Sequence, residues 1–197
     1  MNKNLEKFLR GLEEKSNFLL IDLEANSQNE GFQDGIILET IQIGFIVFDY
    51  NFQILNKGSI FIKPRLNSKL SDFIKGLTGI KQDSIDAGLS FKDGLEKMVG
   101  LMNKYNCSYI LSYGNYDMKQ FFSDCKINEI SYPFFEGDTW HFSKHINIKN
   151  ALASKLNIKE KGMENLLKYL GLNLEGTHHN GEDDCYNILQ LIKNQFK

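Results

Sequence analysis

The feature that most constrains the fold is a short apolar run, Phe18–Leu23 (FLLIDL), which ends beside two acids. An apolar run of this length is typical of a buried strand. Residues two apart on a strand point to the same face, so the carboxylates of Asp22 and Glu24 converge. Two like charges in close approach repel unless a cation lies between them, and Mg²⁺ prefers oxygen ligands of this kind. By itself the D-x-E pattern is equally consistent with a solvated strand end.

The rest of the chain predicts a mixed α/β fold. Leu38–Asp49 and Phe52–Ile62 are rich in β-branched and aromatic residues and are separated by a polar turn at Tyr50–Asn51, which indicates a β-hairpin. A further short strand is expected at Tyr109–Tyr113. We expect helices near Ser68–Lys75, from Ser90 to about Tyr105, from near Tyr116, and near His145–Leu156, Gly162–Leu170 and Gly181–Phe196, with a weak strand near Phe134–Trp140. In such sheets, ligands bind beyond the carboxyl ends of the central strands.

Composition limits the class of protein. The chain has 197 residues, of which 42% are hydrophobic and 24% charged, and this suits one ordinary globular domain. We divide it into an N-terminal amphipathic helix (1–16), packed on the domain through residues such as Leu5 and Phe8, and a main domain (17–197). No apolar run is long enough to span a bilayer and the start of the chain is polar, so we expect a cytoplasmic protein without a membrane role.

The cysteines and the net charge narrow the function further. Cys107, Cys125 and Cys185 form no C-x-x-C pair, so we expect buried free thiols. Proteins that grip long nucleic acids usually carry a basic excess, whereas this chain has a net charge of −2. If the substrate is nucleic acid, a short single-stranded end held through bound cations suits this charge better than a long duplex.

Two later segments add candidate site residues. Asp117 follows the strand at Tyr109–Tyr113; in a helix's first turn an acid also simply complements the helix dipole. Near the C-terminus, His179 and Asp184 suit a site if His179 lies on a loop and Asp184 on the following helix, capped by Asn180. His178 is the competing histidine. We prefer His179 with Asp184, because Asp184 borders the apolar stripe of that helix whereas Asp183 is expected to face water.

The order of these motifs resembles that of the DEDDh exonucleases of the RNase H-like superfamily. They are a D-x-E after the first strand, an Asp after a later strand and an H-x4-D near the C-terminus. The segments ETIQIGFIVFD, LTGIKQDSID, SYGNYDMKQF and EGTHHNGEDDCYNI are similar to the branch of KapD-like bacterial proteins and of eukaryotic exoribonucleases that act on histone mRNA ends and small RNAs. The resemblance covers roughly Asn17 to Gln195.

The resemblance implies a mixed five-stranded sheet with the second strand antiparallel, flanked by helices, and two divalent cations, Mg²⁺ or Mn²⁺. It implies that Asp22, Glu24 and Asp184 hold the first cation, that Asp22 bridges to the second, and that Asp117 acts partly through water. His179 would be the general base. The expected activity is 3′→5′ hydrolysis of single-stranded nucleic acid, with RNA favoured over DNA, to release 5′-mononucleotides.

The resemblance also implies a substrate-binding set, formed by Ala25, Asn26, Thr78, Gly79 and Ile80. The backbone of Ala25 and Asn26 would meet the terminal sugar, and Ile80 would either lie beside the terminal base or make an ordinary core contact. Two alternatives for the function remain open: an oligoribonucleotide hydrolase, and a non-catalytic nuclease-fold module that binds nucleic acid or a protein. Protein partners cannot be named from the sequence.

Overall fold

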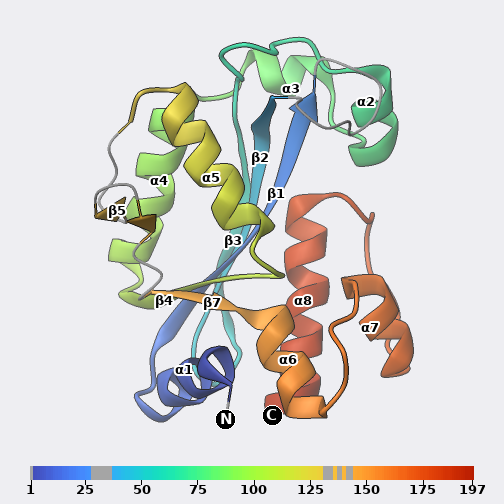
Figure 1. The fold of residues 1–197 in the computed structure, drawn as a ribbon. Coiled ribbons are helices and arrows are strands. Elements are labelled where there is room, and N and C mark those ends of the chain that lie inside the picture. Colours follow the sequence, from blue (N-terminus) through green and yellow to red (C-terminus); the bar gives the residue numbers. More distant parts are fainter. Residues whose placement is uncertain (1, 28–36, 131–134, 137–138, 141–143) are drawn as a thin grey trace.

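The computed structural model describes residues 2–27, 37–130, 135–136, 139–140 and 144–197, and its centre is a mixed five-stranded sheet (Figure 1). The sheet has the order β3-β2-β1-β4-β7, with β1 (Asn17–Ser27), β2 (Leu38–Phe48), β3 (Ile54–Phe61), β4 (Cys107–Ser112) and β7 (His145–Asn147). β2 is antiparallel to β1 and to β3, whereas β1, β4 and β7 are parallel to one another. The predicted mixed sheet with an antiparallel second strand is confirmed.

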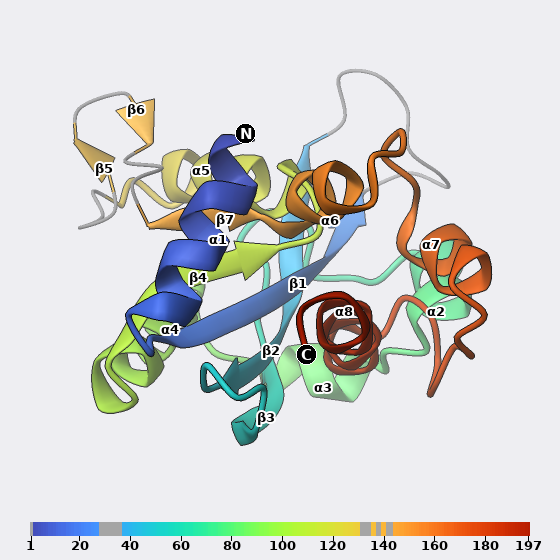
Figure 2. The same ribbon diagram turned by 90° about the horizontal axis from the view of Figure 1, so that it is seen from below.

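Helices cover both faces of this sheet. They are α1 (Lys3–Glu13), α2 (Asp72–Thr78), α3 (Gln82–Asp86), α4 (Phe91–Lys104), α5 (Tyr116–Ile127), α6 (Ile148–Leu156), α7 (Met163–Tyr169) and α8 (Gly181–Phe196). α4 and α5 lie on one face, while α1, α6 and α8 lie on the other, with α8 seen end-on in Figure 2. α2 and α3 lie beyond the carboxyl end of β1 (Figure 1). Among the described residues, no helix is long and apolar enough to cross a membrane.

Alternation along β1 divides the core into two layers. Phe18 and Leu20 are fully buried among side chains from α1, α6 and α8, whereas Leu19 and Ile21 are buried against α4 and α5. Successive strand residues point to opposite faces, so the side chain of Asp22 follows Phe18 and Leu20 onto the α8 face. The strand pattern therefore decides which helix meets the first acid of the D-x-E pair.

Helix α1 packs its predicted apolar side on the α6–α8 face. The ring of Phe8 lies between those of Phe18 and Phe196, with centroid distances of 5.2 and 4.8 Å. Asn2 caps the helix by accepting hydrogen bonds from the backbone N–H groups of Asn4 and Leu5. The three cysteines are free and buried, as predicted.

The expected helix at Ser68–Lys75 is wrong in its start, because α2 begins at Asp72 with Ser71 as its cap. The residues before it form an irregular segment whose backbone bonds to buried side chains. The Glu39 carboxylate accepts the N–H groups of residues 65–67, and Asn26 donates to the carbonyls of residues 67 and 69. A backbone satisfied in this way has no need of helical hydrogen bonds.

The expected helix at His145–Leu156 is also wrong at its start. Residues 145–147 form β7, the fifth strand, which pairs with β4, and α6 begins only at Ile148. Asn147 ends the strand and caps the helix by accepting the N–H of Asn150 at 3.0 Å. The weak strand predicted near Phe134–Trp140 falls partly outside the described residues. Its described parts, β5 (Phe135–Glu136) and β6 (Thr139–Trp140), pair with each other in a separate two-stranded sheet.

Candidate active site

Three elements bring the predicted acids together at the carboxyl end of the parallel strands. β1 supplies Asp22 and Glu24, the first turn of α5 supplies Asp117, and the first turn of α8 supplies Asp184. Ligand oxygens of Asp22, Glu24 and Asp184 lie within 4.8 Å of one another. The side chain of Asp184 is 6% exposed, whereas Asp183 is partly exposed, so the inward orientation expected for Asp184 is observed.

The position of Asp184 depends on close backbone contact between α8 and β2. Gly44 of β2 lies directly opposite Asp22 in the sheet, and the backbone of Gly181 packs on it. A Cβ at Gly44 would overlap the backbone of Gly181, so only glycine permits this approach. The N–H of Gly181 donates to Oε1 of Gln42 at 3.1 Å, and Asn180 caps the helix as predicted. The start of α8 is therefore fixed against the strand that pairs with Asp22.

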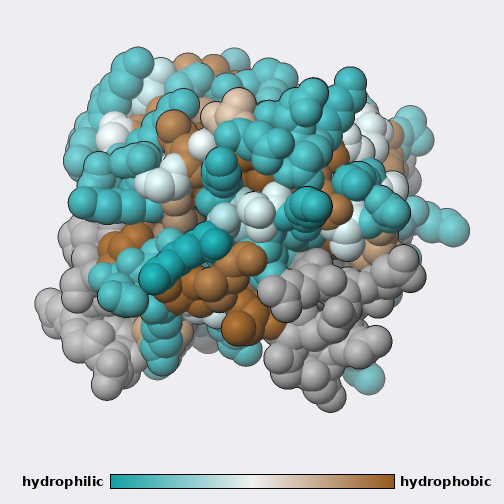
Figure 3. Space-filling view, turned by 90° about the horizontal axis from the view of Figure 1, so that it is seen from above, coloured by the Kyte–Doolittle hydropathy of each residue, from teal (hydrophilic) through white to brown (hydrophobic). Residues whose placement is uncertain are grey.

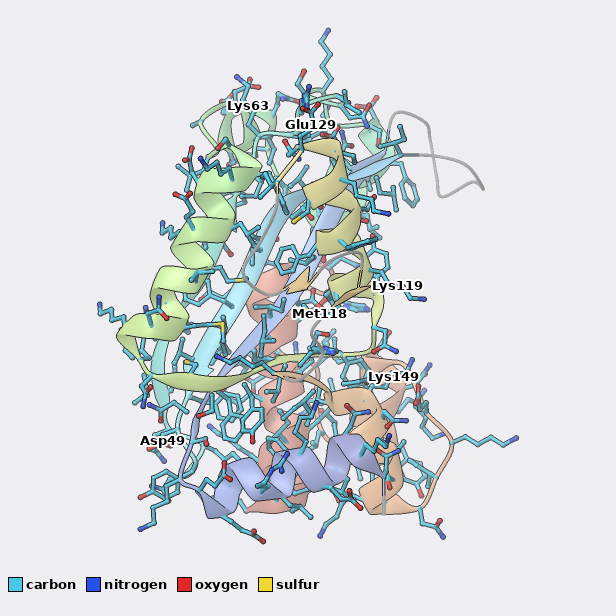
Figure 4. The ribbon with its side chains drawn as sticks, turned by 60° about the vertical axis from the view of Figure 1, so that its left-hand side comes forward. Asp49, Lys63, Met118, Lys119, Glu129 and Lys149 are labelled. Carbon is cyan, nitrogen blue, oxygen red and sulfur yellow. The ribbon has the colours of Figure 1, made fainter. Side chains whose placement is uncertain are left out.

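Asp117 is held by the neighbouring strand. Its Oδ1 accepts the backbone N–H of Leu23 at 3.1 Å, which ties the start of α5 to β1. The hydroxyl of Ser112, at the end of β4, donates to the carbonyl of Gly114 at 3.0 Å and acts to lower the pKa of Asp117. Oγ of Ser112 lies 2.9 Å from Nε2 of the buried His145. In Figure 4, Met118, the next residue of α5, points toward the sheet while Lys119 points away, which agrees with a buried Asp117.

Burial and mutual repulsion make the ionised forms of these acids unfavourable. Burial raises the pKa of Asp22 well above its usual value, and Asp117, Glu24 and Asp184 raise it further. Burial, with Asp184 and then Asp117, raises the pKa of Glu24 to about 8. Burial raises the pKa of Asp117 to about 6, against the hydrogen bonds from Leu23 and Ser112. Carboxylates in this arrangement are stabilised as anions by a bound cation.

Both histidines of the doubled pair lie at the site. Nδ1 of His178 is 3.0 Å from each carboxylate oxygen of Asp184, while His179 contacts Oδ2 of Asp184 through its backbone N–H at 3.0 Å. Their rings are stacked, with centroids 4.0 Å apart. Burial lowers the pKa of His179, and His178 lowers it further. The sequence singled out His179 by spacing, and the structure adds that His178 is the histidine whose ring contacts Asp184.

The four acids and both histidines line a cavity of about 410 Å³. Apolar and aromatic side chains that sequence reasoning missed also line it. They are Leu23, Leu77, Tyr113, Tyr116, Met163 and Ile188. Tyr116 directly precedes Asp117 and is 47% exposed. An aromatic residue directly beside a candidate acid was a signal in the sequence. Leu77 and Met163 reach the cavity only through the packing of α2 and α7, which no local pattern reveals.

The residues expected to bind substrate lie in different settings. Ala25 lines the cavity. The side chain of Asn26 is fully buried, where it holds the segment before α2. Thr78 donates to the carbonyl of Ile74 and accepts the N–H of Ile80, and Gly79 ends α2 in the left-handed conformation. Ile80 is 6% exposed and packs with Ile74 and other residues of a third core cluster.

The donor set fits divalent cations. Buried carboxylate oxygens that converge, with pKa values raised by burial and by one another, offer hard oxygen ligands whose charge needs compensation. Asp22, Glu24 and Asp184 form one such group. Asp117 lies beside it, since its charge acts on both Asp22 and Glu24.

A sheet of this topology with converging acids at its carboxyl edge defines a nuclease of the RNase H-like fold. The model of the exonuclease family (RNase_T) matches residues 19–192, so the chain belongs to this family. The chain is also similar to the nuclease domain of 3′hExo, a DEDDh family member bound to rAMP. The two structures share 26% sequence identity with a TM-score of 0.81, over 91% of each chain.

Two curated relatives show the range of similarity. Rat 3′-5′ exoribonuclease 1 is 30% identical over 182 residues, which cover 87% of this chain and 50% of the relative. The probable 3′-5′ exonuclease KapD of Bacillus subtilis is 27% identical over 179 residues, which cover 90% of this chain and 83% of the relative. The chain therefore spans about half the length of the mammalian relatives it matches and most of KapD.

Proposed function

We propose that the protein is a metal-dependent 3′→5′ exonuclease that shortens single-stranded RNA from its 3′ end and releases 5′-mononucleotides. The observation that carries this proposal is the convergence of four buried or half-buried carboxylates and two histidines in one cavity. A module that only binds nucleic acid has no need of four mutually repelling acids, whose burial costs folding free energy.

In this proposal the four acids hold two divalent cations, Mg²⁺ or Mn²⁺. Asp22, Glu24 and Asp184 would hold the first, and Asp22 with Asp117 would hold the second. When bound, the cations supply Lewis-acid activation of water and compensate the charge of the reacting phosphate. The chain's own contribution is to fix the ligands, through the Gly44–Gly181 contact for Asp184 and through the N–H of Leu23 for Asp117.

His179 acts as the general base. Its ring lines the cavity, and its backbone is fixed by the hydrogen bond from its N–H to Asp184. A neutral imidazole nitrogen accepts the proton of the attacking water as the new P–O bond forms and the bond from phosphorus to the 3′ oxygen of the preceding nucleotide breaks. Burial, with His178, lowers the pKa of His179 and so favours the neutral ring that a base requires.

The cavity favours a single-stranded end. Its volume of about 410 Å³ suits a terminal nucleotide rather than a duplex. The half-exposed ring of Tyr116 offers a surface on which a base can stack, an interaction that tolerates any sequence. Figure 3 shows a face that is mainly hydrophilic, with hydrophobic side chains in smaller patches. RNA is preferred in this proposal because several relatives are named exoribonucleases and a similar 3′-exonuclease structure concerns the 3′ end of a histone mRNA stem-loop.

The test compares single-stranded RNA and DNA, each labelled at the 3′ or the 5′ end, with Mg²⁺, Mn²⁺ or a chelator. We expect metal-dependent release of mononucleotides from the 3′ end, lost in Asp22→Asn and retained in Glu96→Gln, an exposed acid of α4. A length series from 2-mers to 30-mers separates an exonuclease from an oligoribonucleotide hydrolase. Absence of 3′ shortening in the wild type would refute the proposal.

A second comparison assigns the base. His179→Ala is expected to lower the rate by roughly 10²–10⁴-fold, the usual contribution of a general base. His178→Ala leaves that base in place and is expected to cost less. An undiminished rate in His179→Ala, with a large loss in His178→Ala, would transfer the role to His178.

A further inference from the structure

We propose that His178, His179 and Asp184 form a second metal site, selective for zinc-like transition ions, which competes with the catalytic cations for Asp184 and inhibits the enzyme. The two imidazoles and the carboxylate each offer one ligand atom, and these atoms lie within 4.8 Å of one another. Asp22 and Glu24 form a different candidate metal cluster with Asp184, which is the one residue common to both sets.

The spacing of the donors suits a tetrahedral ion. Two ligands bound at roughly 2.0–2.1 Å with tetrahedral geometry stand about 3.3 Å apart. Nδ1 of His178 already lies 3.0 Å from both oxygens of Asp184. The ligand atom of His179 lies within 4.8 Å of the others, so a rotation of its side chain completes a three-ligand set. The fourth position stays open for water, as in other zinc sites with three protein ligands.

The backbone around these donors is already fixed. His179 adopts a left-handed conformation (φ 65°), which is uncommon for a residue other than glycine. Its N–H bonds to Asp184, Asp183 accepts the N–H of Thr177 at 2.9 Å, and Asn180 caps α8. The two histidines and Asp184 are thus held on one side of the helix start before any ion binds. His178 is 34% exposed, which leaves a path for an ion from solvent.

Ligand chemistry separates the two sites. Mg²⁺ prefers oxygen ligands, which Asp22, Glu24 and Asp184 provide. Imidazole nitrogens suit Zn²⁺, Ni²⁺ and Cu²⁺, and sites with nitrogen ligands bind these ions more tightly than Mn²⁺. An ion held by His178, His179 and Asp184 withdraws one carboxylate from the catalytic cation and occupies the imidazole that we propose as the base. The inhibition rests on the proposed function, whereas zinc binding itself does not.

The experiment titrates zinc alone into metal-free protein by isothermal titration calorimetry, without RNA. His178→Asn is the informative variant, because an amide nitrogen can replace Nδ1 in the hydrogen bond to Asp184 but is a poor zinc ligand. His179→Gln is a second variant of the same kind. Glu24→Gln removes a ligand from the Asp22–Glu24–Asp184 cluster but none from the proposed zinc site. Glu164→Gln is the matched control, because Glu164 is an exposed acid whose charge acts on His179 without belonging to the site.

We expect zinc affinity to fall in both histidine variants by at least the roughly 10–100-fold that loss of an outer-shell partner costs a metal site. Glu24→Gln and Glu164→Gln should bind zinc within a few-fold of wild type. Thermal melts establish that each variant is folded. The proposal would be overturned if both His178→Asn and His179→Gln bound zinc with wild-type affinity, or if Glu24→Gln alone lost zinc binding. Zinc would then occupy the Asp22–Glu24–Asp184 cluster.

A second readout tests the inhibition. In RNA-shortening assays supported by Mg²⁺, the ratio of rates with and without added zinc is measured for each variant. We expect zinc to inhibit the wild type strongly and His178→Asn more weakly, each compared with its own zinc-free rate. Equal inhibition of both proteins would also overturn the proposal. If no protein shortens RNA but the calorimetric pattern holds, the zinc site stands and the proposed nuclease function fails.

Discussion

Replacing Gly44 by alanine tests whether the position of Asp184 depends on the contact between β2 and α8. Gly44 lies opposite Asp22, and the new Cβ would overlap the backbone of Gly181 and Glu182. In the other direction, a Cβ at Gly181 would lie 2.9 Å from the carbonyl oxygen of Asp22. Gly44 has no positive φ, so alanine introduces no backbone strain of its own and the overlap alone is tested.

The size of the effect follows from what the methyl group meets. Non-bonded carbon atoms pack at roughly 3.5–4.0 Å, so the first turn of α8 must move by about 1–2 Å to admit it. Backbone atoms cannot rotate away as a side chain does, so we place the loss at or above the upper end of the ~1–3 kcal/mol typical of overpacking. Asp184 moves with the helix, and a displacement of about 1 Å at a catalytic group can lower the rate by roughly 10²-fold.

Three measurements check this reasoning: urea unfolding, Mn²⁺ affinity by calorimetry, and the rate of RNA shortening. The control is Gly100→Ala in α4, where an added Cβ meets no atom within 4 Å. The free energy of unfolding of this control should rise by up to ~0.8–1.0 kcal/mol, because alanine is more favourable than glycine by that amount inside a helix. The reasoning fails if Gly44→Ala unfolds with the wild-type free energy and binds Mn²⁺ as tightly as the wild type.

Three further predictions concern the charges and caps around the site. Glu24 has a folded-state pKa of about 8, above its usual 4.5, so in metal-free protein its contribution to stability is present below about pH 4.5 and is lost as pH rises toward 8. Thermal melts should therefore show a loss on the order of a few kcal/mol over this range, and saturating Mg²⁺ should remove it. Asp124→Asn replaces an acceptor of hydrogen bonds from Thr40 and Gln120 with an amide that also carries donors, and should cost about 1–3 kcal/mol in urea unfolding; an unchanged midpoint would contradict this. Asn180→Ala removes the cap of α8 and should cost about 1 kcal/mol and weaken Mn²⁺ binding, whereas a purely local effect would leave Mn²⁺ affinity intact.

The parts of the fold that the sequence predicted are those set by local patterns. A short apolar run indicated β1, and two segments rich in β-branched and aromatic residues around a polar turn indicated the hairpin. Caps such as Ser90 and Asn180 marked the starts of α4 and α8. The start of α2 and the strand β7 were mispredicted because distant partners decide them. Glu39 and Asn26 satisfy the backbone before α2, and β4 provides the pairing that makes residues 145–147 a strand. No window of the local sequence contains these partners.

The predictions about the site also divide into those set by local patterns and those decided by distant partners. Strand alternation predicted that Asp22 and Glu24 point to the same face, and the place of Asp184 at the edge of an apolar helix stripe predicted its inward orientation. The ring of His178 on Asp184 could not be predicted, because it depends on the left-handed turn at His179. The inward packing of Ile80 likewise depends on its neighbours in space, which include Ile41 and Ile85.

The four acids differ in how the protein compensates their charge, and this difference bears on the metal binding that we propose. Asp117 accepts a hydrogen bond from Leu23, and Asp184 accepts them from His178 and His179, so the chain itself offsets part of the cost of burying these two anions. By contrast, burial raises the pKa of Asp22, and Asp117, Glu24 and Asp184 raise it further, while burial, Asp184 and Asp117 raise the pKa of Glu24. Because a cation relieves repulsion most where the protein supplies least compensation, Asp22 and Glu24 gain most from the first bound ion. In the proposed arrangement Asp184 would complete the coordination of that ion, and Asp117 would belong with Asp22 to the second.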